Sequence, residues 1–247
     1  GPLVAGRDPV TSYPEGATPL GVPVAPGAAF LLGADRLFRD VLARLAWATR
    51  LSLATALLAT ALSAGAGTAF GLVAGWRAGD AVGRVLSVLL DAAQGVPFAL
   101  MLLVIGATAA PTTPLGMAVT LAVFGWVGFA RAARARALTL RREPYIDAAR
   151  ALGQTPARIL LQHVAPQLTP TLAPLAAMAL PQFVLAESTL AYLGLGLPPP
   201  TPTLGQMVAE GQETLAVAPW LLAAPAAVLV ALGVAFFLLA DGLGEAP

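Results

Sequence analysis

RREPYIDAARALGQTPARILLQHVAP, residues 141–166, is the longest polar, helix-forming passage in a chain that is otherwise largely apolar. The passage predicts two short helices joined at a glycine. Glu143 and Pro144 begin the first helix, because proline at the first helical position loses no hydrogen bond and an acidic residue at that end suits the helix dipole. Gly153 ends this helix, at a place where a left-handed residue is favoured. The sequence therefore predicts a short double-helical element with its joint at Gly153.

Apolar residues in the same passage indicate how the two helices are built. Those of the first helix recur at helical spacing and predict one small apolar face: Tyr145, Ala148, Ala149 and Leu152. The second helix is expected to start at Thr155-Pro156, which repeats the signal of a cap followed by proline. Pro166 is expected to stop it.

The composition is typical of a membrane protein. Of the 247 residues, 57% are hydrophobic and 11% are charged, whereas a soluble domain carries roughly 25% charged residues. The chain has no cysteine and one histidine, which excludes disulfides and a multi-histidine metal site. All 14 basic residues are arginine, so the lysine-containing phosphate-binding loop of many ATPases cannot be present. We therefore predict no enzyme activity, no catalytic residue, no metal and no cofactor in this chain, and no nucleic-acid partner.

Five apolar stretches predict membrane-spanning helices, so the predicted fold class is an all-α integral membrane protein. About 20 apolar residues cross a bilayer as a helix, and stretches of this kind occupy residues 51–76, 85–110, 115–130, 166–190 and 220–240. In the first of them, Gly67, Gly71 and Gly75 recur at every fourth residue. In a membrane this spacing lets a second helix approach closely, so these glycines are predicted helix-packing residues.

The distribution of arginines predicts the orientation. Seven arginines lie between residues 131 and 158, and none lies between residues 194 and 219. Because positively charged loops stay in the cytoplasm, the loop at 141–166 is expected there. Counting the spans then places the proline-rich N-terminal arm outside the cell and the C-terminal tail inside.

These expectations divide the chain into three parts. Residues 1–50 form an extracytoplasmic arm followed by an interfacial amphipathic helix, expected at 35–50. Residues 51–241 form the membrane domain, and residues 242–247 form a cytoplasmic tail.

The jointed passage resembles the cytoplasmic coupling loop of ABC-importer permeases. That family carries Glu-Ala-Ala, three residues, glycine, nine residues and a short apolar stretch that ends in proline. Asp147-Ala148-Ala149, Gly153 and His163-Val164-Ala165-Pro166 match this pattern, with aspartate in place of the glutamate and alanine in place of the leucine before the proline.

A second motif narrows the resemblance. FLLGADRLFRD, residues 30–40, is similar to the H-x-L-G-T-D-x-x-G-R-D signature of dipeptide and oligopeptide permeases. The matching positions are Gly33, Asp35, Arg39 and Asp40. The chain thus resembles the C-type permease subunit of the dipeptide, oligopeptide and nickel importers. Such subunits carry an additional N-terminal span, so this sequence is expected to begin after it.

The resemblance implies a fold, a set of partners and a function. The fold is the type I ABC-importer transmembrane domain with a cytoplasmic coupling helix, in the inner or plasma membrane. The chain would form half of a translocation path, opposite a second homologous permease. Two ATPase subunits would bind ATP and magnesium, and an extracytoplasmic binding protein would deliver a di- or oligopeptide, nickel or another small solute. The residues implied in ATPase coupling are Glu143, Tyr145, Asp147, Ala148, Ala149, Gly153, His163 and Pro166.

Polar residues in or beside the spans support other interpretations. The candidates for the pathway are Asp91, Gln94, Gln182 and Glu187. An acid inside a span is costly to bury and is a functional candidate. An alternative function is therefore an ion-driven secondary transporter that uses Asp91 or Glu187. An intramembrane peptidase would need paired aspartates, a Ser-His pair or a zinc cluster in the spans, and none is evident.

Overall fold

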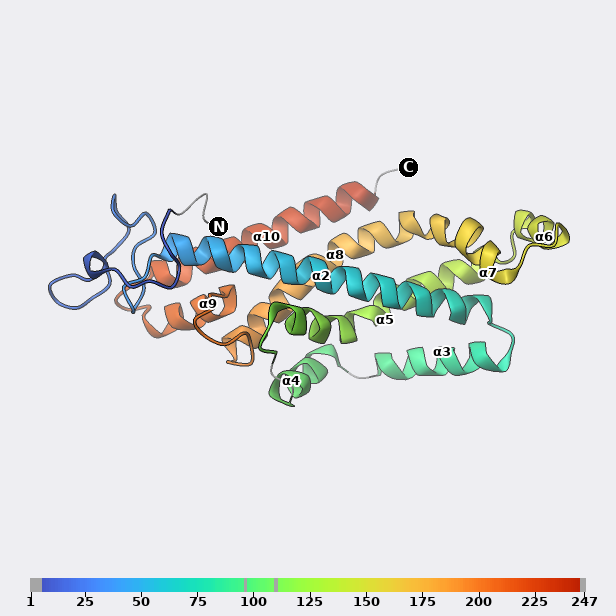
Figure 1. The fold of residues 1–247 in the computed structure, drawn as a ribbon, viewed down its shortest axis with the longest axis horizontal. Coiled ribbons are helices and arrows are strands. Elements are labelled where there is room, and N and C mark those ends of the chain that lie inside the picture. The colour runs from blue at the N-terminus through green and yellow to red at the C-terminus, as the bar shows by residue number, and fades with distance from the viewer. Residues whose placement is uncertain (1–5, 96, 109–110, 245–247) are drawn as a thin grey trace. The chain divides into compact units, whose positions relative to one another are not determined.

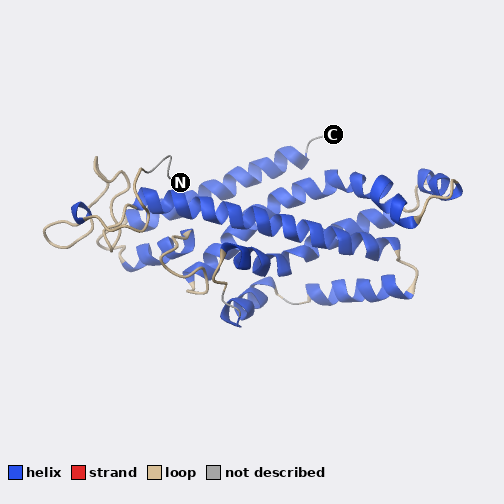
Figure 2. Cartoon of the chain, in the orientation of Figure 1, coloured by secondary structure: helices blue, strands red, loops and turns tan. Residues whose placement is uncertain are grey.

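The computed structural model describes residues 6–95, 97–108 and 111–244, and these residues are mostly helical (Figures 1 and 2). No strand occurs in this part of the chain, where β-pairing is limited to isolated bridges in the N-terminal arm. The longer helices are α2 (Val41–Trp76), α3 (Ala81–Gln94), α4 (Phe98–Thr108), α5 (Pro114–Leu140), α8 (Thr169–Tyr192), α9 (Leu204–Glu213) and α10 (Trp220–Gly244). The shorter ones are η1 (Pro14–Gly16), α6 (Pro144–Ala151), α7 (Pro156–Ile159), η2 (Leu160–Val164) and η3 (Ala165–Leu168).

Four of the described helices are long and apolar enough to cross a membrane, one fewer than predicted. They cover Val41–Trp76, Pro114–Leu140, Pro156–Tyr192 and Trp220–Leu243. The predicted span at 85–110 is wrong as a single helix, because α3 ends at Gln94 and α4 begins at Phe98.

Local backbone chemistry accounts for this division. The N–H of Gly95 bonds to the carbonyl of Ala92 at 3.1 Å, which closes the last turn of α3. Pro97 directly precedes α4, where the N–H that proline lacks would have no helical partner. The apolar stretch at 85–110 therefore contains the end of one helix and the start of the next, although its hydrophobicity alone predicts a single span.

The start of α2 corrects a second prediction, the interfacial helix at 35–50. Asp35 lies outside any helix, and its carboxylate accepts hydrogen bonds from the backbone N–H groups of Leu37 and Arg39, both at 2.9 Å. Asp40 then caps α2 by accepting from the N–H of Ala43 at 2.8 Å, as aspartate does at helix starts. Val41–Trp76 is consequently one continuous helix of 36 residues. At the other end of the chain, α10 continues to Gly244, so the predicted tail at 242–247 is helical over its first residues.

The chain divides into two compact units, and both contain parts of α2, α4, α5, α8 and α10. The first unit takes its described residues from 1–58, 102–121 and 180–235. Its apolar core joins the start of α2 to α9 and the start of α10, and consists of Val41, Leu45, Ala48, Leu204, Met207, Ala218 and Leu221.

The second unit takes its described residues from 59–101, 122–179 and 236–244, and here α2 packs on α5 through its glycines. A Cβ atom on Gly67 would lie 2.8 Å from the Cβ of Phe129, and one on Gly75 would lie 2.7 Å from the carbonyl oxygen of Arg134. A Cβ on Gly71 would lie 2.9 Å from the Cα of Ala130 and closer still to its carbonyl oxygen. The two backbones therefore approach to a distance that only glycine permits at these three positions.

Candidate functional site

The jointed element at 144–168 is built by its glycine and prolines. Helix α6 ends in a Schellman motif: Gly153 has a φ of +76°, its N–H bonds to the carbonyl of Arg150 at 2.9 Å, and the N–H of Gln154 bonds to that of Ala149 at 3.1 Å. Glycine adopts this left-handed conformation without the steric penalty of other residues. The hydroxyl of Thr155 then caps α7 by accepting from the N–H of Arg158 at 3.4 Å. Two helix axes therefore meet within four residues.

Pro166 does not stop the second helix, which corrects the prediction made from the sequence. The chain widens into a π-helical turn at Leu160–Val164, tightens into a 3₁₀ turn at Ala165–Leu168, and continues as α8. In the wide turn the N–H of Ala165 bonds to the carbonyl of Leu160. A change of helical pitch can accommodate a proline, whose ring would otherwise clash with the preceding turn. The element is thus continuous with a candidate span.

One side of the element is packed against the end of α5. Ile146 and Ala149 of α6 join Ile159 of α7 and Val164 of η2 in a cluster with Ala137 and Leu140 of α5. Ala149 is only 5% exposed. The apolar face predicted from Tyr145, Ala148, Ala149 and Leu152 is therefore wrong in composition, since the inward residues are Ile146 and Ala149.

The opposite side of the element exposes apolar groups. Leu152 is 81% exposed, Tyr145 is 37% exposed, and Ala148 is also exposed. These three residues are spaced by three and four positions and so share one face of α6. We call them the outer face of α6. Within the described chain this face is uncovered, whereas Ala149 lies beneath it.

Polar contacts fix the element in place. The ring Nε2 of His163 lies 2.9 Å from the side-chain oxygen of Gln154, and the side-chain amide of Gln167 donates to the hydroxyl of Tyr145 at 2.9 Å. The guanidinium of Arg141 donates to three carbonyls at the end of α2: those of Gly75 at 3.4 Å, Trp76 at 3.1 Å and Ala78 at 3.2 Å. All three contacts come from one terminal nitrogen of Arg141, Nη1, so this nitrogen holds Arg141 on carbonyls that lie close together at the end of α2.

The remaining residues implied in coupling lie on the surface of the element. Asp147 pairs with Arg150 at 2.7 Å, and the guanidinium of Arg150 lies 5.2 Å from the ring centre of Trp76. Glu143 is the N-cap of α6 by position, without a side-chain capping bond. The element is therefore anchored to both α2 and α5 within the second unit.

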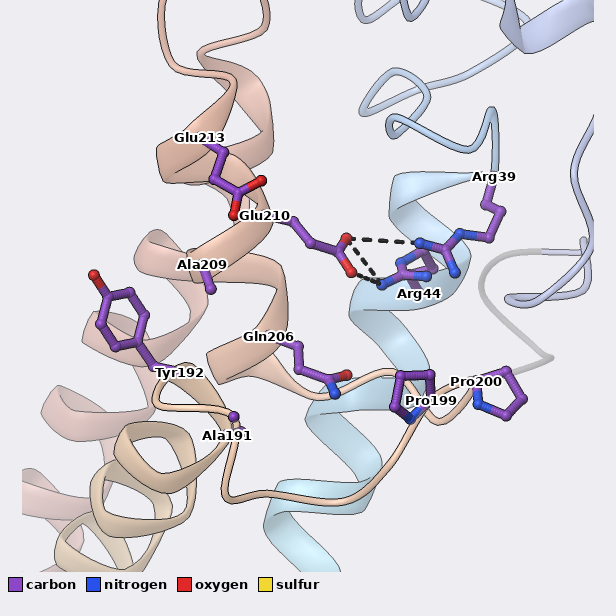
Figure 3. A pocket seen from close by; sticks show the side chains of 11 residues that line it. Arg39, Arg44, Ala191, Tyr192, Pro199, Pro200, Gln206, Ala209, Glu210 and Glu213 are labelled. Carbon is purple, nitrogen blue, oxygen red and sulfur yellow. Dashed lines mark hydrogen bonds and ion pairs between the residues drawn. The ribbon is translucent and has the colours of Figure 1, made fainter.

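A separate polar site lies in the first unit, where an ion network joins the start of α2 to α9 (Figure 3). Arg44 is 2% exposed, and its terminal nitrogen contacts both oxygens of Glu210 at 3.1 Å. Asp35 pairs with Arg39 at 2.6 Å and with Arg44 at 3.2 Å, and Arg39 also lies 3.6 Å from Glu210. Arg39, Arg44 and Glu210 border a pocket of about 240 Å³ that Tyr192 and Gln206 also line. Removing one member of such a buried network leaves another charge without its partner, so the network fixes α9 on α2.

The predicted pathway residues fall into two groups. Glu187 is buried in α8, accepts a hydrogen bond from Ser52 at 2.8 Å, and lies in the first unit with the exposed Gln182. Asp91 and Gln94 lie in the second unit, where they line a hollow together with Arg131 and Arg134. From the sequence, Arg131 and Arg134 are interpreted as topology signals, lipid-headgroup contacts or partners of an ATPase, and not as lining a hollow. The ion pair of Arg44 with Glu210 has no signal in the sequence.

The chain is similar to known transport proteins over most of its length. Residues 67–245 match the family described as binding-protein-dependent transport system inner membrane component. The chain is 32% identical over 224 residues to the glutathione transport system permease protein GsiD of Pectobacterium atrosepticum, covering 90% of this chain and 73% of that protein. It is 29% identical to the dipeptide transport system permease protein DppC of Haemophilus influenzae, covering 88% and 73%. It is 32% identical to the oligopeptide transport system permease protein OppC of Mycobacterium bovis, covering 90% and 76%.

Solved structures show the same fold. The MetNI methionine ABC transporter, in an inward-facing conformation, contains a chain that superposes with a TM-score of 0.63 and 20% identity. The match covers 81% of this chain and 94% of that one. At this identity the likeness concerns the fold, which is that of a type I importer transmembrane domain.

Proposed function

The chain belongs to the family of binding-protein-dependent transport system inner membrane components, and from this premise we propose that it is a permease subunit of an ATP-driven importer of di- or oligopeptides. The part of the chain that the structure describes has four helices long and apolar enough to cross a bilayer, so the chain is a multi-pass membrane protein. The observation that carries the proposal is the anchored element at 144–168 with an uncovered apolar face.

The peptide class rests on two features of the sequence. The relatives described above are named for dipeptide, oligopeptide and glutathione transport, and all of these substrates are short peptides. In addition, the stretch at 30–40 is similar to the signature of dipeptide and oligopeptide permeases. Nickel and other small solutes are the alternatives that a substrate screen must include.

The element at 144–168 can act as a mechanical link. The outer face of α6, formed by Tyr145, Ala148 and Leu152, would sit in a groove of a soluble ATPase in the cytoplasm. Movement of that groove would reach α5 through the packed side chains of Ile146 and Ala149, and would reach α2 through the bonds of Arg141. Because Gly153 and its hydrogen bonds close the joint, the two short helices would move as one piece. The spans could then open a central path to alternate sides of the membrane.

The proposed assembly supplies what this chain lacks. No lysine is present for a phosphate-binding loop, so ATP and magnesium would be bound by two ATPase subunits. A second homologous permease would complete the path. An extracytoplasmic binding protein would dock on the N-terminal arm and on the segment at 193–219. This segment contains no arginine, as expected of a loop outside the cytoplasm. The arginine-rich segment around the coupling element would face the cytoplasm.

Uptake into vesicles tests the proposed function. We expect the chain, assembled with its ATPases and second permease in proteoliposomes, to accumulate a labelled dipeptide only when ATP and the binding protein are both supplied. The uptake should be unaffected by a proton uncoupler or a sodium ionophore, because the energy comes from ATP. Uptake that survives without ATP but collapses with an uncoupler would instead support an ion-driven transporter. Labelled nickel, tested in parallel, would identify the alternative substrate.

A further inference from the structure

A hollow of about 540 Å³ in the second unit is lined by charged residues of α3 and α5. Asp91 and Gln94 come from α3, and Arg131 and Arg134 come from α5. We propose that this hollow is a transient binding site for the charged ends of the peptide, with Asp91 facing the α-ammonium group and the two arginines facing the α-carboxylate. This inference rests on the proposed function and assigns the residues that would hold the substrate within the permease.

The charged side chains that line the hollow form no ion pairs within the described residues. In the described residues, neither Asp91 nor Arg131 forms an ion pair or a side-chain hydrogen bond. Arg134 donates to the hydroxyl of Ser87 through its Nε at 3.1 Å, and this bond leaves both of its terminal nitrogens available. An acid and two bases that line one space without neutralising each other are suited to a ligand that carries both charges.

The combination of charges in the hollow, at the end of the predicted span, favours a transport role. Arg131 lies nine residues before the end of α5, and hence about 14 Å along the helix axis from it. Charged residues in a membrane-spanning helix generally face a water-filled cavity or a path for a polar solute. Arg131 directly follows the span predicted at 115–130, where topology alone accounts for an arginine, but topology does not account for the aspartate that lines the same hollow.

The chemistry of the lining fits a short peptide with free termini. A guanidinium holds a carboxylate through two parallel hydrogen bonds, and a carboxylate accepts from an ammonium group. Gln94 offers both a donor and an acceptor, which a peptide bond requires. The volume lies within the range of roughly 300–1,000 Å³ that small-molecule sites occupy. Gly128 also lines the hollow, and a Cβ atom there would meet open space, so no side chain obstructs it.

A binding cycle between protein variants and peptide variants tests the site. The assembled transporter in lipid nanodiscs, without the binding protein, is measured for binding of labelled alanyl-alanine. We expect Asp91→Asn and Arg131→Gln each to weaken binding by about tenfold, the value of one charge-assisted hydrogen bond. Amidation of the peptide's carboxylate should weaken binding to the wild type more than binding to Arg131→Gln, in which only Arg134 still faces the carboxylate. Acetylation of the peptide's amino group should weaken binding to the wild type but add no further loss in Asp91→Asn, because Asp91 is the one acid in the proposed site.

Controls separate this site from other effects. Arg136→Gln removes an exposed arginine from the same helix outside the hollow, and it should bind like the wild type. The loss of dipeptide binding in the two hollow variants should persist in nanodiscs made of phosphatidylglycerol alone. If the loss appears only when phosphatidylethanolamine is present, the hollow binds a zwitterionic lipid headgroup, and the proposal is overturned. Wild-type affinity in both hollow variants, or no dipeptide binding by the wild type, would also overturn it. If the binding site fails these tests but the wild type still takes up peptide, the proposed function stands. If the wild type takes up no peptide, the proposed function is refuted as well.

Discussion

Leu152→Arg is expected to abolish peptide uptake while leaving membrane insertion and helix content unchanged. Leu152 is 81% exposed, so its replacement removes almost no packing within the chain. In the assembled transporter this side chain would lie in the groove of the ATPase, where an unpaired charge costs about 3–5 kcal/mol. A loss of that size corresponds to a decrease in coupled uptake of about a hundredfold or more. Leu152 is a better test than Gly153, because a side chain at Gly153 would also strain a backbone with a φ of +76°.

The measurement pairs uptake with co-purification of the ATPase subunits. Leu152→Met keeps an apolar side chain at the same position, and it should retain both uptake and the complex. Leu152→Arg should lose uptake and bind the ATPases weakly, yet elute as a folded membrane protein. Normal uptake by Leu152→Arg would show that the outer face of α6 is not the docking surface.

Gly71→Leu is expected to prevent α2 and α5 from packing and to reduce the yield of folded protein severely. A Cβ atom at Gly71 would already lie 2.9 Å from the Cα of Ala130. The obstacle is backbone and cannot rotate away, so the helices would have to separate. Overpacking typically costs 1–3 kcal/mol where side chains can adjust, and we expect more than about 3 kcal/mol here.

Gly65→Ala is the matched control for this prediction. Gly65 lies in the same helix, but a Cβ atom there would meet no atom within 4 Å. The alanine variant should therefore fold as well as the wild type, since alanine favours a helix more than glycine does. Thermal unfolding of the detergent-solubilised proteins, followed by size-exclusion chromatography, gives the comparison. Equal melting temperatures for Gly71→Leu and Gly65→Ala would contradict the close approach of the two helices.

Features encoded by adjacent residues could be predicted from the sequence. Glycine at every fourth residue of the first span indicated a close helix contact, and the structure places Gly67, Gly71 and Gly75 against α5. Proline at a helix start and glycine at a helix end gave the two short helices at 144–159. Both signals act within one or two turns, so they need no knowledge of the rest of the fold.

Features that depend on distant partners could not be predicted. Arg44 and Glu210 are 166 positions apart, and neither carries a local signal of the other. Which residues of α6 turn inward depends on where α5 ends, so Tyr145 and Leu152 were wrongly placed with Ala149. Pro166 was expected to end a helix, because the sequence does not reveal that a π-turn and a 3₁₀ turn would accommodate it.

The central claim is that the outer face of α6 docks on an ATPase in the cytoplasm. The chain has no cysteine, so Ala148→Cys introduces a single thiol on this exposed face, and Ala149→Cys introduces one beneath it as a buried control. In the assembled transporter, a thiol crosslinker on Ala148→Cys should capture an ATPase subunit, and a membrane-impermeant maleimide should label it only from the cytoplasmic side. Labelling from the outside, or capture no greater than with Ala149→Cys, would contradict the account.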